Sequence, residues 1–289
     1  MIKSFQNILV TGGAGYIGSH TCLALLESGF NVVAVDNLVN SSYESLLRVQ
    51  KLTDRDLVFC QADLLDQPAL EDVFRDQNIH AVMHFAGLKA VGESEKKPLD
   101  YYYVNVTSTC NLCRIMQDFG VTDIVFSSSA TVYGEPEQVP ITEDFSEQPT
   151  NVYGRTKFIN EQILADLVRA GSSWNVGILR YFNPVGAHPS GWIGEDPAYI
   201  PNNLMSYICQ VAVNNLDKLN VFGDDYSTPD GTGVRDYIHV MDLAYGHVRT
   251  LEKLGQNPGL KIYNLGTGQG NRSRGPNFCR AALKRSGAM

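Results

Sequence analysis

A glycine-rich turn between an apolar run and a helical stretch constrains the fold of this chain more than any other feature. Gly12, Gly15 and Gly18 form a G-x-x-G-x-x-G pattern between the apolar run 8–10 and the helical spacing of 19–28. Glycines so placed permit a tight turn, close approach of the backbone to a pyrophosphate, and close packing of the helix on the sheet. The first turn of the helix offers unpaired N–H groups to the phosphate. The pattern predicts a dinucleotide site, and a purely structural turn is the alternative.

An acidic residue follows the second apolar run. Residues 32–35 lead directly into Asp36. A carboxylate at this place accepts a hydrogen bond from an adenosine ribose 2′-hydroxyl and repels a 2′-phosphate. The sequence therefore favours NAD over NADP as the cofactor.

Apolar runs alternate with helical stretches over the first 180 residues. Further runs occur at 57–59, 81–85, 124–126 and 176–179, and helical stretches at 68–77, 100–119 and 153–169. Unbroken apolar strands that alternate with helices predict a parallel sheet buried on both faces. The expected fold class is α/β, with a Rossmann-type doubly wound sheet in an NAD-binding domain over residues 1–180.

The pattern changes after residue 180 to a region rich in glycine, proline and asparagine. Regular spacing returns within 231–265, where we expect a helix over 240–254 and a strand over 261–265. We interpret 181–270 as a smaller, incomplete substrate domain, and expect part of 231–265 to pack back on the first domain.

Composition argues against several classes of protein. With 19% charged and 44% hydrophobic residues, the 289-residue chain is typical of globular proteins. Its net charge of −8 argues against a nucleic-acid partner. No apolar stretch approaches about 18 residues and no signal-peptide core is present, so we expect no membrane span and a cytoplasmic location. The cysteines and histidines lack metal-ligand spacing, so we expect no metal site.

Tyr153 and Lys157 are four residues apart in a helical stretch, 24 residues after Ser129. Residues with this spacing share a helix face, so the ammonium can lie beside the phenol. A phenol ionises near pH ~10, and a neighbouring cation lowers its pKa. Beside a dinucleotide site, the pair is typical of proton transfer coupled to hydride transfer. On an exposed helix it would be only a solvated tyrosine and lysine.

Taken together with the glycine turn, these residues give a family resemblance. The chain resembles the extended short-chain dehydrogenases/reductases and, among them, the UDP-glucose 4-epimerases. The resemblance covers roughly residues 7–270, and the long segments 85–94, 180–188, 200–205 and 231–240 carry it. Related dehydratases place an Asp-Glu pair where this chain has Ala130 and Thr131, which disfavours elimination of water from the sugar.

The resemblance implies the site residue by residue. The implied contacts to NAD are Gly12, Gly15, Tyr16, Ile17, Gly18, Asp36, Asn37, Leu38, Val39, Asn40, Ser41, Asp63, Leu64, Phe85, Ala86, Gly87, Leu88, Lys89, Asn105, Ser129, Tyr153, Lys157 and Phe182. The implied contacts to the UDP-sugar are Ser129, Tyr153, Asn183, Asn203, Leu204, Asn220, Val221, Phe222 and Arg235. Alternatives remain open: Asn105 as a helix-surface residue, Leu204 and Phe222 as core, and Arg235 as an ion-pair partner of Asp236.

The implied reaction is the interconversion of UDP-glucose and UDP-galactose by transient oxidation at C4 of the sugar with bound NAD. Tyr153 is expected to act as the base on the 4-hydroxyl, while Lys157 lowers the pKa of the phenol. Ser129 is expected to align the 4-oxygen or to relay its proton. The alternatives are another nucleotide-sugar enzyme such as a 4,6-dehydratase, or a non-catalytic NAD-binding remnant. Tolerance of N-acetylated sugars and homodimer formation through helix faces 100–118 and 153–170 are left open.

The resemblance ends after Gly270. Residues 271–289 contain five Lys or Arg and no Asp or Glu, and Pro276 interrupts any helix begun there. We expect an aberrant basic tail that arises from a frameshift or an early end of the coding sequence, with a natural short isoform as the alternative. On this interpretation NAD binding is retained and affinity for the UDP-sugar falls, which leaves the activity of the chain open.

Overall fold

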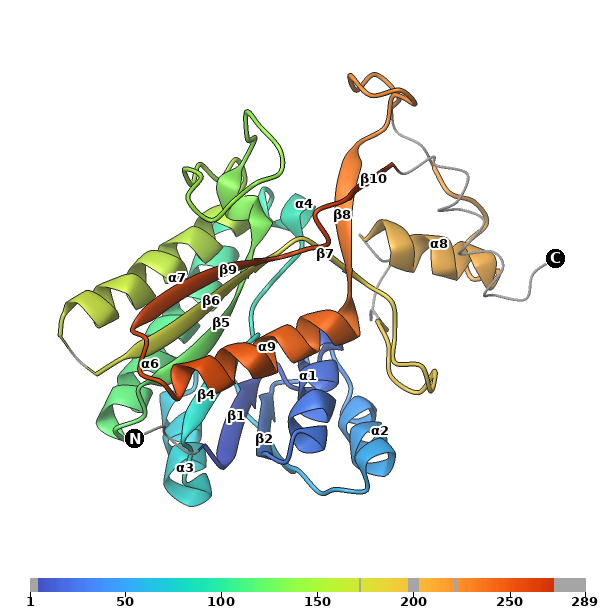
Figure 1. The fold of residues 1–289 in the computed structure, drawn as a ribbon. Coiled ribbons are helices and arrows are strands. Elements are labelled where there is room, and N and C mark those ends of the chain that lie inside the picture. Colours follow the sequence, from blue (N-terminus) through green and yellow to red (C-terminus); the bar gives the residue numbers. More distant parts are fainter. Residues whose placement is uncertain (1–4, 172, 197–202, 221–222, 273–289) are drawn as a thin grey trace.

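The computed structural model describes residues 5–171, 173–196, 203–220 and 223–272 (Figure 1). Its centre is a parallel sheet of seven strands in the order β3-β2-β1-β4-β5-β6-β9. The strands are β1 (Asn7–Thr11), β2 (Asn31–Asp36), β3 (Val58–Gln61), β4 (Ala81–His84), β5 (Asp123–Ser129), β6 (Asn175–Tyr181) and β9 (Leu260–Leu265). The expected α/β fold with a parallel, doubly wound sheet is confirmed.

Helices cover both faces of this sheet, which is why its strands are apolar without alternation. One layer contains α1 (Tyr16–Glu27), α2 (Glu44–Thr53) and α9 (Val240–Leu254); the other contains α3 (Gln67–Gln77), α6 (Ser108–Asp118) and α7 (Val152–Arg169). Successive side chains of a strand point to opposite faces, so Ile8 packs in the first layer and Leu9 in the second. Both residues are fully buried.

The helical stretch expected at 100–119 consists of three parts. Helix α5 (Pro98–Tyr102) and α6 are separated by a π-helical turn, η1 (Tyr103–Thr107). A π turn changes the hydrogen-bond pattern of a helix locally and is often found at functional sites. Here the carbonyl of Asn105 accepts a hydrogen bond at 3.0 Å from the side chain of Asn160 in α7. The turn therefore bonds α7 to the α5–α6 helical segment.

After β6 the chain leaves the sheet and later returns to it. A second, mixed sheet of three strands contains β7 (Asn183–Val185), β8 (Val234–His239) and β10 (Gly270–Arg272), with α8 (Leu204–Ala212) beside it in Figure 1. Helix α9 then packs against α1, and β9 pairs with β6. Strand β10 includes the first two residues of the expected tail, and the remainder of that tail lies outside the described residues.

The order of the strands reverses at β1, whose neighbours are β2 and β4. In open parallel sheets, ligands bind at the carboxyl ends of the strands where the order reverses. The carboxyl ends of β1, β4 and β5 are Thr11, His84 and Ser129. Short segments follow there: α4 (Val91–Ser94) after β4, and a 3-10 turn, η2 (Ala130–Tyr133), after β5.

Candidate active site

The glycine turn after β1 is shaped by backbone that passes close to it. Gly12 has a φ of +69°, and a Cβ there would lie 2.8 Å from the nitrogen of Ala86. A Cβ on Gly18 would lie 2.1 Å from the carbonyl oxygen of Gly12. At Gly15 the nearest atom to a Cβ is the same oxygen at 3.3 Å, and no side chain caps the helix that begins next to it. The open side of Gly15 and the uncapped first turn fit a pyrophosphate.

Asp36 organises the loops on either side of the end of β2. One carboxylate oxygen accepts from the nitrogen of Ala14 at 3.0 Å. The other accepts from the nitrogen of Leu38 at 2.9 Å and the hydroxyl of Ser41 at 2.7 Å. A carboxylate offers roughly four acceptor positions, so this oriented group has room for a ribose hydroxyl as well. Asn37 extends the arrangement, because its amide donates to Asp63 at 2.9 Å after β3.

Asn105 clamps the loop that follows β4. Its side-chain oxygen accepts from the nitrogen of Leu88 at 2.7 Å, and its amide donates to the Leu88 carbonyl at 3.0 Å. The amide also donates to the hydroxyl of Thr156 at 3.0 Å. Asn105 is only 3% exposed, so it is not the helix-surface residue of the alternative interpretation. It holds the loop 85–89 in place through its backbone.

Tyr153 and Ser129 meet where α7 begins and β5 ends. Asn151 caps α7 by accepting a hydrogen bond from the nitrogen of Gly154 at 2.7 Å, which starts the helix next to the end of the sheet. The side chain of Ser129 lies close enough to the phenol of Tyr153 to lower its pKa. The Ser129 hydroxyl accepts from the nitrogen and hydroxyl of Thr131, at 3.2 and 3.0 Å. The proposed base therefore lies beside Ser129.

Lys157 lies next to this pair and is directed elsewhere. The residue is 5% exposed, and its ammonium donates to the carbonyl of Ser127 at 2.8 Å. Its distance to the centre of the Tyr153 ring is 5.9 Å. Burial lowers the pKa of Lys157 to about 8, although the nearby Glu161 carboxylate raises it. The lysine is therefore mostly charged at neutral pH.

The pKa of Tyr153 differs from the sequence-based expectation. Burial raises it to about 12, and the hydrogen bond from Ser129 lowers it only in part. We expected Lys157 to lower the pKa of the phenol, but its ammonium is held at the Ser127 carbonyl. Desolvation of the phenolate is therefore the larger effect in the protein alone.

The residues expected to contact the UDP-sugar are more dispersed. Asn183 in β7 donates to the carbonyl of Asp236 at 3.0 Å, and Asn203, just before α8, donates to Glu195 at 2.8 Å. Arg235 is exposed and donates to its neighbour's carbonyl, while Asp236 accepts from the backbone of the loop after β9. Leu204 is partly buried at the start of α8, Asn220 is exposed, and Val221 and Phe222 lie outside the described residues.

Sequence reasoning missed Glu195, which joins the cofactor and substrate sides. Its carboxylate accepts from Lys89 at 3.2 Å, from Asn203 at 2.8 Å and from the hydroxyl of Ser206. On the same side, the phenol of Tyr16 donates to the carbonyl of Gly186 at 2.6 Å. Glu195 is in an irregular region with no periodicity, so no sequence pattern marks it.

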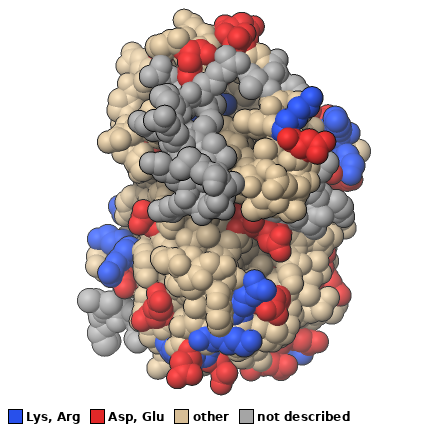
Figure 2. Space-filling model, turned by 90° about the vertical axis from the view of Figure 1, so that its right-hand side faces the viewer, with Lys and Arg blue, Asp and Glu red and all other residues tan. Residues whose placement is uncertain are grey.

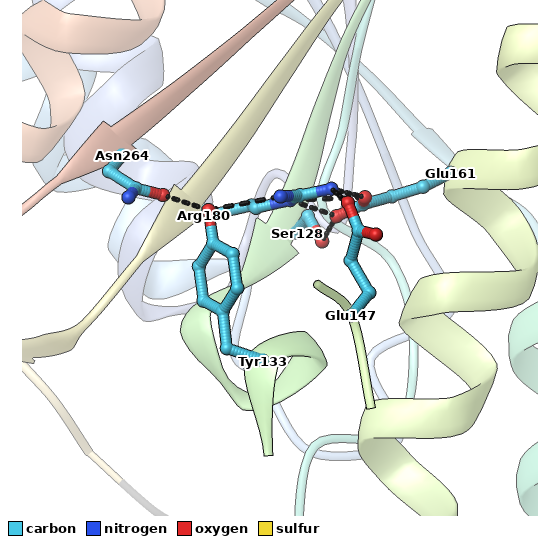
Figure 3. A network of polar contacts seen from close by, with 6 residues as sticks. All are labelled: Ser128, Tyr133, Glu147, Glu161, Arg180 and Asn264. Atoms are coloured by element: carbon cyan, nitrogen blue, oxygen red, sulfur yellow. Dashed lines mark hydrogen bonds and ion pairs between the residues drawn. The ribbon is translucent and has the colours of Figure 1, made fainter. Parts of the chain in front are cut away.

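A buried network around Arg180 was also missed (Figure 3). The guanidinium lies between Glu161, Glu147 and Tyr133, and Tyr133 donates onward to Asn264 at 2.7 Å. A sequence pattern was available, because Arg180 is a charged residue at the end of an apolar strand. Such a residue needs a buried partner.

The described part of the chain shows no metal cluster and no membrane helix. On the face in Figure 2, basic and acidic side chains are intermingled. Within the described ranges there is no cluster of three or more His, Cys, Asp or Glu that could hold a metal ion. None of the helices in the described part of the chain has the length and apolar character of a membrane span.

Comparisons with known proteins agree with this geometry. The model of the NAD dependent epimerase/dehydratase family matches residues 8–266, and the chain belongs to this family. Among its relatives, the UDP-glucose 4-epimerase of Bacillus subtilis (strain 168) is 63% identical over 263 residues, which cover 91% of this chain and 78% of the relative. The UDP-glucose 4-epimerase of Homo sapiens is 57% identical over 272 residues, with coverage of 92% and 78%.

A solved structure is similar over the same length. The UDP-glucose 4-epimerase from Bifidobacterium longum in complex with NAD+ and UDP superposes with a TM-score of 0.90 at 51% identity. The match covers 92% of this chain and 80% of that one.

Proposed function

We propose that the chain is a UDP-glucose 4-epimerase, which interconverts UDP-glucose and UDP-galactose by transient oxidation at C4 of the sugar. The observation that carries the proposal is that Tyr153 lies beside Ser129 at the carboxyl end of the sheet, with Lys157 next to them and bonded to the Ser127 carbonyl. The chain's 63% identity to the UDP-glucose 4-epimerase of Bacillus subtilis supports it.

The residues around the glycine turn fit NAD. When bound, NAD would supply a reversible acceptor for the hydride that leaves C4 of the sugar, and a positive charge next to Tyr153. The turn at Gly12, Gly15 and Gly18 receives the pyrophosphate, and Asp36 accepts from the adenosine ribose. Asn105 acts indirectly by holding the loop 85–89, because the three contacts of its side chain are to the protein.

Tyr153 takes the proton from the 4-hydroxyl of the sugar and later returns it. Since burial raises the pKa of the phenol to about 12, the phenolate depends on positive charge and hydrogen bonds in the loaded site. Ser129 supplies one such hydrogen bond and holds the 4-oxygen or relays its proton. Lys157 supplies positive charge 5.9 Å from the ring.

The UDP end is proposed to lie against the second sheet and α8. Asn183, Asn203, Leu204, Asn220 and Arg235 are the described candidates, with Val221 and Phe222 completing the set. Arg235 is exposed, and its planar guanidinium suits a diphosphate. The similar Bifidobacterium longum structure contains UDP, which supports a uridine nucleotide as the ligand.

The test is conversion of UDP-galactose to UDP-glucose by the purified chain in a coupled assay. The expected result is turnover without added NAD if the cofactor co-purifies, or after NAD is supplied if it does not. NAD binding without turnover would identify a non-catalytic remnant. Formation of a 4-keto-6-deoxy sugar would identify a dehydratase instead.

A homodimer is a further proposal. Tyr103 is 59% exposed and lies within the helix stretch 100–118, whose part in pairing the sequence left open, and Leu99 just before that stretch is 80% exposed. Exposed apolar side chains of this kind are typical of a protein interface. Sedimentation tests the dimer, and cell fractionation tests the expected cytoplasmic location.

A further inference from the structure

A buried ion pair joins the helix of Tyr153 to the strands beside it. Arg180 in β6 and Glu161 in α7 have side chains that are 1% and 2% exposed. The Arg180 Nε donates to both carboxylate oxygens of Glu161 at 3.1 Å, and Nη2 donates to one of them at 2.6 Å. This fork-like contact fixes the orientation of both side chains.

The remaining polar atoms of the pair are also bonded (Figure 3). Nη1 of Arg180 donates to the Tyr133 hydroxyl at 2.9 Å, and Nη2 also donates to Glu147 at 2.6 Å. The Tyr133 ring lies against the guanidinium, and the distance from Arg180 Cζ to the centre of the ring is 4.9 Å. Glu161 accepts a further hydrogen bond from the hydroxyl of Ser128 in β5. The network therefore links α7, β5, β6 and η2 through directional contacts.

The network is adjacent to the proposed catalytic contact. Glu161 follows Lys157 by four residues and Tyr153 by eight, so all three lie on the same side of α7. In the sheet, Ser128 is paired with Arg180, one position before Ser129.

Three consecutive serines of β5 thus contact the same helix. Ser127 accepts from Lys157 through its carbonyl, Ser128 donates to Glu161, and Ser129 lies beside Tyr153 and lowers its pKa. The middle contact is the one reinforced by Arg180. A shift of α7 along β5 would break the ion pair and separate Tyr153 from Ser129 together.

We propose that Arg180 and Glu161 are positioning residues for the sugar oxidation, and that their ion pair fixes the place of α7 along β5 and with it the position of Tyr153 beside Ser129. This proposal rests on the proposed epimerase function. Its physical basis is that a fork-like ion pair specifies one relative position, whereas apolar side chains of similar size pack in several.

A purely stabilising role makes a different prediction. Buried ion pairs are often replaced by apolar residues of similar volume without loss of stability, because desolvation offsets their attraction. The double substitution Glu161→Met with Arg180→Met therefore distinguishes an effect of the ion pair on stability from an effect on the position of α7. Glu147, with a side chain 28% exposed, is solvated once Arg180 is gone, and Tyr133 keeps its bond to Asn264.

The experiment compares the full chain with this double variant. We expect a melting temperature close to that of the wild type and lowered only by the buried Ser128 hydroxyl, which loses its acceptor. NAD retention and the KM for UDP-galactose should be unchanged. We expect kcat to fall by about 10²-fold, the loss typical of a misplacement of about 1 Å in a catalytic group. Hydrogen–deuterium exchange should be faster in residues 152–160 and unchanged in α3.

Two further variants complete the test. The exposed pair Arg249 and Glu252, both replaced by Met, is the matched control and should retain wild-type kcat. Arg180→Lys keeps the charge without the planar fork, and should reduce kcat even if the double variant fails to fold.

Each outcome decides between the proposals. A stable double variant with wild-type kcat and exchange would overturn the positioning role, as would Arg180→Lys with full kcat. A wild-type chain that does not convert UDP-galactose would contradict the proposed function instead. In that case the exchange of residues 152–160 still tests the effect of the ion pair on α7.

Discussion

The ammonium of Lys157 lies 2.8 Å from the carbonyl oxygen of Ser127 and 5.9 Å from the centre of the Tyr153 ring. The lysine is therefore anchored to the strand next to the base, and acts on the phenol by charge at a distance. The charge on Lys157 therefore affects how readily the Tyr153 phenol gives up and takes back its proton.

We predict that kcat falls as the pH rises through about 8, where burial places the pKa of Lys157. Glu161 on the same helix raises this pKa, and the Phe126 ring from β5 lies 4.9 Å away. His84 from β4 is neutral here, since burial and then Lys157 lower its pKa to about 3. In the protein without cofactor, burial raises the pKa of Tyr153 and of Tyr181, so neither phenol accounts for a decline near pH 8.

The measurement is the pH dependence of kcat, with Lys157→Arg as the control. Arginine stays charged, so this variant should be slower and lack the alkaline decline. A wild-type profile that is flat from pH ~7 to ~9.5 would contradict the prediction.

The same shift predicts the sign of a stability change. The unfolded chain binds the Lys157 proton more tightly, because the pKa of the lysine is 10.5 there and about 8 in the fold. The free energy of unfolding should therefore increase as the pH rises from about 8 to 10.5, so this lysine makes the fold more stable over that range. Urea unfolding of wild type and Lys157→Met across this range checks it, since the contribution should be absent in the variant.

Tyr153→Phe should lower kcat by about 10²-fold or more, because it removes the group that exchanges the proton. NAD retention should be unchanged. The check is turnover of UDP-galactose together with the amount of bound NAD. Activity above about a tenth of wild type would be inconsistent with Tyr153 as the base.

Gly15→Ala and Gly18→Ala should have different effects. A Cβ on Gly18 meets the Gly12 carbonyl at 2.1 Å, so the turn must shift and both stability and NAD affinity should fall. A Cβ on Gly15 is 3.3 Å from that oxygen, so the fold should tolerate it while NAD affinity falls. Thermal melting and NAD titration separate the two, and Gly92→Ala is the control because nothing lies within 4 Å of its Cβ. Equal NAD affinity in Gly15→Ala and wild type would place the pyrophosphate elsewhere.

Asn105→Ala should lower the free energy of unfolding by about 1–3 kcal/mol, because the partly buried backbone N–H and carbonyl of Leu88 lose their partner. NAD affinity should fall as well, since the loop 85–89 loses its clamp. Asn215→Ala, at an exposed site, is the control. Unchanged NAD affinity would show that the loop is held by other contacts.

Local pattern was enough to predict the sheet and the shared helix face of Tyr153 and Lys157. Unbroken apolar runs such as 32–35 require burial on both faces, and the spacing of Tyr153 and Lys157 places them on one helix face. The direction in which Lys157 points depends on β5, whose Ser127 carbonyl it bonds. The spacing of residues along one helix carries no information about that strand. The rise in the pKa of Tyr153 has the same origin, because burial is produced by the whole fold.

Contacts between distant segments explain the other misses. Glu195 is bonded by Lys89, which is 106 positions away, and Arg180 by Glu147, which is 33 positions away. No local periodicity marks such partners. The π-helical turn at Tyr103–Thr107 was also missed, since its apolar pattern reads as ordinary helix.

Strand β9 pairs with one edge of β6, the strand that contains Arg180. The ribosome synthesises β9 about 80 residues after β6. Until residue 265 has left the ribosome, β6 is an edge with unpaired backbone groups, and edges of this kind readily pair with other chains. The order of synthesis thus sets a period in which the nascent protein is open to strand exchange. A chaperone that binds extended segments would have its best target there.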